Sequence, residues 1–385
     1  MQLICDRKQC TGCGMCSNVC QHHAIEMVED DKGFVHPIIN NNCIDCGLCV
    51  NKCPSNNKPN MNEAQNVFSS WTKDKKSRSK SSSGGIFTEL AKSVILDNGV
   101  VVGSRWSKIF TPEHVVIKNI NDLDELKGSK YAQSFTGNIY IQVKELLNKG
   151  IKILFSGTPC QVAALRKFLD RDYQNLITVD LVCHGVPSTK MLRQHYSEIH
   201  NSEVTNVCLR YKDPYWDYSY VKVDFIDGYK YQKLTLEDSY FNLFNIGYSL
   251  RESCHNCEYT NIDRVSDITL SDFWGYLPKN FKGHNYNYGT SCVIINTSKG
   301  KELFDSVKER VYCEQSTLDE AIKANKCLSE PFKIEQNLLI EFWNDYKIGT
   351  TLYELNKKYA YNYFVLPSHL WLRRIYYKFR WIFKR

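Results

Sequence analysis

Residues 10–20 read CTGCGMCSNVC, and residues 43–54 read CIDCGLCVNKCP. Each stretch places three cysteines with two residues between them, and a fourth cysteine follows after three more residues. Thiolates at this spacing can wrap a tight loop around one metal–sulfur core, while the fourth thiolate points toward a second core. The two runs are the one internal repeat of the sequence, and they predict a small metal-binding module near the N-terminus.

The spacing of both runs is that of bacterial ferredoxins with two 4Fe–4S clusters, in which the last cysteine of each run ligates the other cluster. The predicted ligands are therefore Cys10, Cys13, Cys16 and Cys53 for the first cluster, and Cys43, Cys46, Cys49 and Cys20 for the second. Structural zinc is the alternative, but zinc sites pair two C-x2-C knuckles and do not interlock runs of four. Gly12, Gly14 and Gly47 suit a close approach of the backbone to a cluster. Cys5 lies outside the pattern and is interpreted as a small core residue.

The composition indicates a folded protein with more than one domain, because 385 residues exceed one ordinary core. No apolar run is long enough to span a bilayer, and the first 20 residues lack a signal-peptide core, so we expect a cytoplasmic protein. In that compartment the 17 cysteines favour metal ligation over disulfides. Six of the seven net positive charges lie in residues 370–385. The rest of the chain is nearly neutral, so no nucleic-acid partner is expected.

The remainder of the chain alternates β-rich runs with segments of helical spacing, which predicts a mixed α/β core. Predicted strands cover residues 67–72, 100–103, 152–155, 177–182, 204–211, 220–226 and 268–271. Predicted helices cover residues 86–96, 139–147, 161–169 and 301–311, and a β-hairpin insertion is expected around residues 215–233. The expected fold is therefore α+β. A ferredoxin-like two-cluster module (1–59) is followed by a connector (60–80), a larger mixed α/β domain (81–345) and a C-terminal extension (346–385).

Four features of the larger domain carry reactive groups where ligands tend to gather. Residues 81–85 read SSSGG before a predicted helix, which suits a phosphate, a flavin ring edge or an ordinary helix cap. Cys160 lies at the N-terminus of another predicted helix, where a thiolate is favoured, and the dipeptide CH at 183–184 follows a predicted strand. The C-x2-C pair at 254–257 suits either a metal or a redox dithiol. Together these later thiols are enough for a third metal centre.

Six stretches in matching order resemble the beta-subunit family of deazaflavin (coenzyme F-420) hydrogenases and dehydrogenases. They read SSSGGIF, LKGSKYAQS, FSGTPCQVAAL, LVCHGVPS, SCHNC and SDITLSDFWG. The resemblance runs from about residue 67 to about residue 311, behind the fused ferredoxin module. It implies an oxidoreductase whose larger domain holds a flavin, usually FAD, beside an iron–sulfur cluster.

The resemblance also implies which residues form that site. The implied flavin-binding residues are Ser82, Ser83, Gly84, Gly85, Lys130, Thr158 and Gln161. The implied metal ligands are Cys160, Cys183, Cys254 and Cys257, which we assign together to a third 4Fe–4S cluster. His184 becomes a candidate catalytic proton donor, with a hydrogen-bonding histidine behind the site as the alternative.

Three functions fit these features. The leading one is an iron–sulfur flavoprotein that passes electrons from the ferredoxin-type clusters through the flavin to an unknown small molecule or second cofactor. Bacterial members of the family make surface polysaccharide biosynthesis a possible context. The alternative is an electron-transfer subunit that serves a separate catalytic partner, and the third is a non-catalytic protein that keeps its clusters for folding. In the first two cases a protein that donates or accepts electrons is the expected partner.

Residues 370–385 show the helical spacing of an amphipathic segment, with aromatic and aliphatic residues on one arc and basic residues opposite. Such a helix can lie in the interface of an anionic membrane. It can equally dock its apolar arc on the protein body. The first interpretation predicts peripheral contact with the inner face of the membrane, and the second predicts a terminal helix packed on the body.

Overall fold

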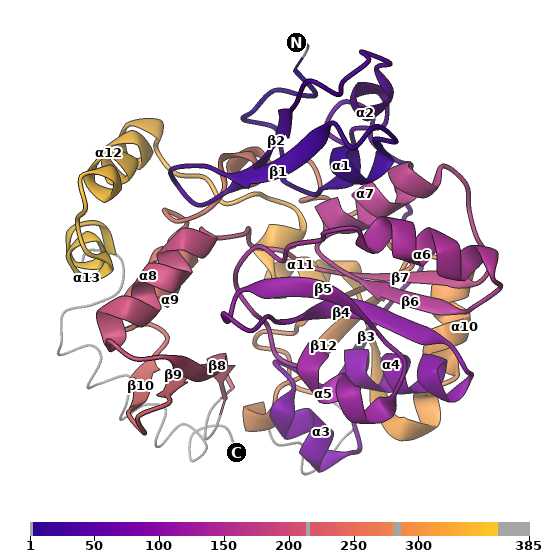
Figure 1. Ribbon diagram of the computed structural model, residues 1–385. Coiled ribbons are helices and arrows are strands. Elements are labelled where there is room, and N and C mark those ends of the chain that lie inside the picture. The colour runs from indigo at the N-terminus through magenta and orange to yellow at the C-terminus, as the bar shows by residue number, and fades with distance from the viewer. Residues whose placement is uncertain (1–2, 213–215, 279, 281–285, 361–385) are drawn as a thin grey trace.

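The N-terminal module contains a two-stranded sheet and two short helices, drawn in indigo in Figure 1 for this computed structural model. The structure describes residues 3–212, 216–278, 280 and 286–360. Strands β1 (Ile25–Glu29) and β2 (Val35–Ile39) pair in antiparallel orientation. Helices α1 (Met15–Val19) and α2 (Leu48–Asn51) each begin inside a cysteine run, directly after a left-handed glycine. The repeat in the sequence is therefore also a repeat in the backbone.

An eight-stranded mixed sheet forms the centre of the larger domain, in the order β13-β3-β12-β11-β7-β6-β4-β5. Its strands are β3 (Asn66–Thr72), β4 (Val100–Trp106), β5 (Pro112–Ile117), β6 (Ile153–Ser156), β7 (Leu176–Leu181), β11 (Ile268–Asp272), β12 (Ser291–Ile295) and β13 (Val311–Ser316). The strands from β4 through β6 and β7 to β11 are parallel, and the other neighbouring pairs are antiparallel. Loops after the parallel strands consequently converge at one edge of the sheet.

Successive side chains of the central strands face two different helical layers, as the period of a strand requires. Val101 and Leu154 pack against α4 (Ile86–Leu96) and α10 (Ser298–Asp305). On the opposite face, Val102 and Phe155 pack with α6 (Ile139–Asn148), α7 (Pro159–Leu169) and the N-terminal module. Met15 of the module belongs to that second cluster and is fully buried. The module therefore shares a hydrophobic core with the larger domain.

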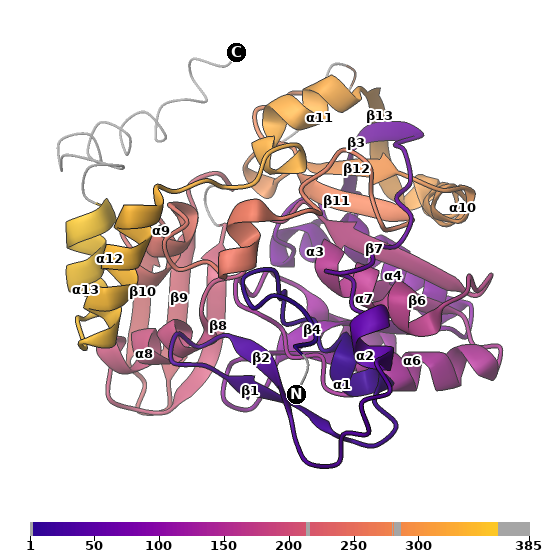
Figure 2. The same cartoon turned by 90° about the horizontal axis from the view of Figure 1, so that it is seen from above.

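A second unit lies beside the main sheet, on the left in Figure 2. It consists of the antiparallel strands β8 (Val204–Tyr211), β9 (Tyr220–Phe225) and β10 (Lys230–Leu234) and the helices α8 (Thr189–Ile199), α9 (Ser239–Asn245), α12 (Gln336–Lys347) and α13 (Leu352–Leu355). Phe34 of the N-terminal module joins the core of this unit and meets Trp343 edge-on at 5.8 Å. The module thus packs on both parts of the larger domain.

The shorter elements connect these layers. Helix α3 (Lys75–Lys80) follows β3, α5 (Leu123–Leu126) follows β5, and α11 (Leu318–Ala324) follows β13. Two 3-10 helices lie near the cysteines of the larger domain, η2 (Glu252–Asn256) and η5 (Lys326–Leu328). Among the described residues, no helix has the length and the apolar character needed to cross a membrane. The basic segment 370–385 lies outside the described residues.

The fold class predicted from the sequence is confirmed: a ferredoxin-like module precedes a larger mixed α/β domain. Most predicted elements lie within three residues of their expected bounds. The helix expected over residues 301–311 is wrong in its second half, because α10 ends at Asp305 and β13 begins at Val311. Residues 60–80, expected as a connector, include the predicted strand 67–72, which is β3 and pairs with β12 on one side and β13 on the other.

Candidate functional site

The first cysteine run and the last cysteine of the second run surround one small cavity. Its lining includes Cys10, Cys13, Cys16 and Cys53, the four residues that the sequence assigns to one cluster. Burial raises the pKa of Cys13 to about 12 and that of Cys16 well above its usual value. Thiolates held so close together and away from water need a positively charged core to balance them, which iron supplies. Cys5, interpreted from the sequence as a core residue, also lines this cavity, and the neighbouring Cys10 and Cys53 thiols raise its pKa.

The larger domain holds the carbonyl groups of the loop at 10–13. Arg251 donates to Cys10 O at 3.0 Å, and Gln133 donates to Thr11 O and Gly12 O, both at 3.0 Å. Thr136 Oγ1 and Tyr140 Oη donate to Cys13 O at 3.1 Å and 2.9 Å. With its carbonyls turned to these donors, the loop is free to aim N–H groups at the thiols. The backbone N–H group of Gly12 acts to lower the pKa of Cys10, and that of Met15 acts to lower the pKa of Cys13.

The second cysteine site is more open. Burial raises the pKa of Cys49, and the neighbouring Cys20 and Cys46 thiols add to the increase. Cys20 therefore lies with the second run, as the crossed pairing requires. Asp45 N donates to Cys43 Sγ at 3.4 Å, so the fourth member of this group also receives a backbone N–H. Cys46 is exposed to solvent.

Four cysteines from three segments of the larger domain form a third group. Cys160 lies in the first turn of α7, Cys183 follows β7, and Cys254 and Cys257 lie in and directly after η2. Burial, together with the Cys254, Cys160 and Cys257 thiols, raises the pKa of Cys183 well above its usual value. Among the described residues, no three Cys, His, Asp or Glu side chains converge closely enough to share a single ion. The thiols of a cubane stand farther apart than that, because irons and sulfides lie between them.

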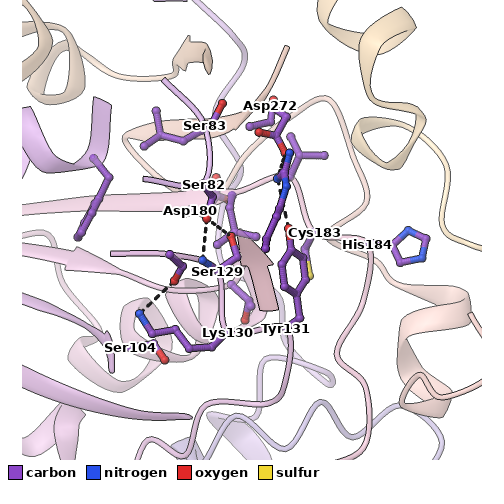
Figure 3. A pocket seen from close by; sticks show the side chains of 18 of the residues that line it. Ser82, Ser83, Ser104, Ser129, Lys130, Tyr131, Asp180, Cys183, His184 and Asp272 are labelled. Carbon is purple, nitrogen blue, oxygen red and sulfur yellow. Dashed lines mark hydrogen bonds and ion pairs between the residues drawn. The ribbon is translucent and has the colours of Figure 1, made fainter. Parts of the chain in front are cut away.

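A large cavity of about 690 Å³ opens between the main sheet and the second unit. The sequence-predicted residues in its wall are Ser82, Ser83, Gly85, Lys130, Thr158, Cys160, Gln161, Cys183 and His184. Several of them surround the space drawn in Figure 3. Gly84 lies behind the wall, where its N–H donates to Ser291 Oγ at 3.0 Å. The structure thus brings two of the four later cysteines into contact with the cavity that holds most of the predicted flavin-binding residues.

Several polar side chains of the predicted flavin site hold the cavity wall in shape. Ser82 Oγ accepts from Ser129 N at 2.7 Å, and Gln161 Oε1 accepts from Thr158 N at 3.0 Å in a capping box at the start of α7. Lys130 Nζ donates to three carbonyl groups of residues 125–128. Burial lowers the pKa of Lys130 to about 7. These contacts fix the loop 127–134 around the cavity.

The structure adds cavity residues that sequence reasoning did not single out. Arg210 of β8 donates to Asp272 Oδ2 at 2.5 Å and to the Tyr131 hydroxyl at 3.2 Å, while its buried Nη2 has no partner among the described residues. Trp216 and Trp274 stack with their ring centroids 4.4 Å apart. Asp272 and Trp274 fall inside the SDITLSDFWG stretch that carries the resemblance, but Arg210 and Trp216 lie in segments without a motif. No local pattern indicates that they face a cavity.

The two histidines of the cavity are both held neutral. His184 Nε2 lies 3.2 Å from Phe244 O, and its Nδ1 lies 3.5 Å from Cys327 Sγ. Burial lowers the pKa of His184. His114 was not predicted to belong to the site, and burial lowers its pKa to about 4. If His184 donates from Nε2 to the carbonyl, Nδ1 is the ring atom that remains able to exchange a proton.

Comparisons with known families cover most of the chain. Two family models match, one for the N-terminal and one for the C-terminal part of the "Coenzyme F420 hydrogenase/dehydrogenase, beta subunit", over residues 67–139 and 150–321 respectively. The chain belongs to this beta-subunit family. Residues 9–57 match a "4Fe-4S dicluster domain". The resemblance inferred from six short stretches is confirmed, and so is the iron–sulfur nature of the N-terminal module.

This beta-subunit-family protein is also similar to a solved chain of the F420-reducing NiFe hydrogenase complex from Methanosarcina barkeri, studied by xenon derivatization. The two chains are 21% identical, with a TM-score of 0.48, over 70% of this chain and 90% of the other. The comparison with curated proteins gave no match. The family models and the dicluster domain establish an iron–sulfur protein of an oxidoreductase family.

Proposed function

We propose that this beta-subunit-family protein is a flavin-dependent iron–sulfur reductase. Electrons pass from the ferredoxin-type clusters to a flavin, and from the flavin to a small molecule or a second cofactor. The large cavity carries the proposal, because Cys160 and Cys183 share its wall with residues that the resemblance assigns to the flavin. A volume of about 690 Å³ is typical of a site for a cofactor-sized ligand.

The positions of the three cysteine groups support a path for electrons through the molecule. Cys20 of the first run lies with the second group, and Cys53 of the second run lies with the first group. Helices α1 and α2 also contact each other. The first and third groups also adjoin, because a charge on Cys160 acts on Cys13 and α1 packs against α7. Tyr140 lies beside both of those thiols. We infer that electrons arrive at the exposed second group and leave the third group at the large cavity.

The cavity offers groups that fit a flavin. Nη2 of Arg210, which has no partner in the part of the chain that the structure describes, can donate to a phosphate or a ring carbonyl, and Asp272 holds that guanidinium in position. Trp216 and Trp274 add an aromatic wall. When bound, a flavin supplies the exchange between one-electron and two-electron chemistry. We propose FAD as the resident flavin, with His184 as the residue that exchanges a proton at Nδ1. The family description names coenzyme F420, and we propose a deazaflavin as one class of second cofactor.

The second candidate is an electron-transfer subunit whose substrate is reduced on a partner protein. The matched family is named for a beta subunit, which favours this possibility. Turnover of a substrate by the purified chain alone would separate the two functions. A role in surface polysaccharide biosynthesis belongs to the same proposal, since the resemblance extends to bacterial members of that kind.

The experiment that tests the proposed function measures the cofactors of the full chain after anaerobic purification. We expect about twelve irons, in three clusters of four, and one extractable FAD per chain. The Cys160→Ala variant should lose about four irons and keep the two clusters of the N-terminal module. Cys313→Ala is the matched control, because Cys313 is a single half-buried thiol on β13, in another core cluster. About eight irons in the unaltered chain, with no flavin retained after reconstitution, would overturn the proposal.

We propose further that the protein works in the cytoplasm and that residues 370–385 bring it to the inner face of the membrane. The amphipathic pattern of that basic segment supports this proposal. Co-sedimentation with liposomes should need anionic lipid, weaken with salt, and disappear when the chain is shortened at residue 369. Equal binding by the shortened chain would contradict it.

A further inference from the structure

Arg251 is a buried cation at the boundary between the N-terminal module and the larger domain. It is 2% exposed. Besides the bond to Cys10 O, its Nη2 donates to Val35 O and to Gln133 Oε1, both at 2.8 Å. The guanidinium carbon lies 5.1 Å from the centre of the Phe34 ring, and the buried Nε has no partner among the described residues. Since a guanidinium stays protonated at physiological pH, a full positive charge is held here away from water.

A buried charge costs several kcal/mol unless an opposite charge balances it. Arg264 is buried to the same degree, and it pairs with Asp180 at 3.0 Å. Within the described part of the chain, no carboxylate forms an ion pair with Arg251. Asp30 acts on it only from farther away, because its carboxylate is paired with Arg7 and lies 3.4 Å from His36.

The groups that can balance Arg251 belong to two different cysteine sites. A negative charge on Cys10, in the first site, stabilises the cation, and so does a charge on Cys254 or Cys160 in the third. The backbone of Arg251 is part of the third site, because its carbonyl accepts from Cys254 N at 2.9 Å. Its side chain reaches the first site through Cys10 O. One residue therefore connects both sites by hydrogen bonds as well as by charge.

We propose that Arg251 is the shared counter-charge of the first module cluster and the cluster of the larger domain, and that it raises the reduction potential of both. The inference rests on the proposed function, since it requires both clusters. Reduction adds one electron to a cluster and makes or breaks no bond, so a fixed cation nearby favours the reduced form. The second cluster lies beyond the first and beside solvent, where water and salt screen this charge.

The test is a redox titration of the anaerobic full-length protein, followed by electron paramagnetic resonance. The Cys46→Ser variant identifies the signal of the second cluster. We expect Arg251→Gln to lower the equilibrium constant for reduction of the first and third clusters at least tenfold. For one electron, this shifts each reduction potential by about 59 mV toward negative values. Arg251→Lys keeps the charge and should recover most of that loss. The second cluster should keep its potential in both variants and serves as an internal control.

Lys8→Met is the matched control for charge. Lys8 stands two residues from Cys10, but its side chain is 75% exposed and only meets Glu252 at 3.8 Å, so its removal should leave all potentials in place. If Arg251→Gln does not fold, Gln133→Glu places a carboxylate beside the guanidinium and should lower the same two potentials. Potentials that stay unchanged in a folded variant, or that shift equally at all three clusters, would overturn the inference. Unaltered protein without any cluster signal would instead overturn the proposed function.

Discussion

The two cysteine runs of the N-terminal module share one backbone conformation. Gly12 and Asp45 stand at the same position of the motif, with φ values of 63° and 53°. Gly14 and Gly47 also correspond, with φ values of 77° and 72°, and each precedes a short helix. The motif therefore fixes the local path of the chain in both runs. It does so although the first run has Gly12 where the second run has Asp45.

The two runs differ in burial: the first is covered by the larger domain, and the second is more exposed. Met15 in the first run is fully buried under α6 and α7, whereas its equivalent Leu48 is only half-buried. In the second run Ile44 is 62% exposed and Cys46 faces solvent. The comparison teaches that the spacing of cysteines determines the loop, while the docking of the module determines which of the two cysteine sites stays exposed to solvent. It also separates two reasons why a position needs glycine: a left-handed backbone conformation, and a lack of room for a Cβ.

The largest expected effect comes from placing alanine at the equivalent positions 12 and 45. A Cβ at Gly12 would lie 2.5 Å from Arg251 Nη2, 2.6 Å from Gln133 Nε2 and 2.8 Å from Val35 O. We expect Gly12→Ala to cost about 1–2 kcal/mol for the left-handed conformation and a further ~1–3 kcal/mol for overpacking. The measurement is the midpoint of anaerobic thermal unfolding at a fixed scan rate, together with the iron content.

Asp45→Ala is the matched variant, because it also places an alanine in the left-handed conformation, at nearly the same φ as Gly12→Ala. Aspartate already tolerates this conformation better than alanine does, so the change should cost at most ~1 kcal/mol. Its side chain is exposed, and no packing is lost. Equal losses of thermal stability in the two variants would show that the docked larger domain does not press on the first run.

Local patterns predicted the two cysteine sites of the N-terminal module, because their ligands lie close together in the sequence. The grouping of Cys20 and Cys53 with opposite runs follows from the motif alone. The third group draws on three segments, and the sequence indicated only that its four thiols were enough for one metal centre. The crowding of Gly12 by the larger domain could not be predicted, since Arg251 fills that space from 239 residues away. The same limit applies to Arg210, whose partner Asp272 comes from another sheet.

The misplaced helix over residues 301–311 has a comparable cause. Leu303, Phe304, Val307 and Val311 are all buried in one cluster, and their spacing fits one face of a helix. In the structure α10 ends at Asp305, the turn at 308–310 reverses the chain, and Val311 starts β13 at the edge of the sheet. Residues from a helix, a turn and a strand can thus reach one core with helical spacing. Pairing with β3, more than 230 residues earlier, decides the outcome.

A smaller effect is expected for alanine at the equivalent positions 14 and 47. Both residues precede a helix at almost the same φ, so Gly14→Ala and Gly47→Ala share a cost of about 1–2 kcal/mol for the left-handed conformation. A Cβ at Gly47 would meet only Asn51 Nδ2, at 4.0 Å. A Cβ at Gly14 would meet Thr136 Oγ1, the atom that donates to Cys13 O. Thr136 can move only by giving up that hydrogen bond, so we expect an extra loss of about 1 kcal/mol at Gly14.

Thr136→Ala turns this pair into a double-mutant cycle, measured by the same thermal unfolding. Threonine removal should relieve the clash, so the combined variant Gly14→Ala with Thr136→Ala should lose less stability than the sum of its single changes. Thr136→Ala combined with Gly47→Ala should be additive, because Thr136 is not among the atoms that a Cβ at Gly47 would meet. Additivity at both positions would mean that the larger domain does not constrain the first run through Cys13. Coupling at Gly14 alone would place that constraint at the first run, where the larger domain holds the carbonyl groups of residues 10–13.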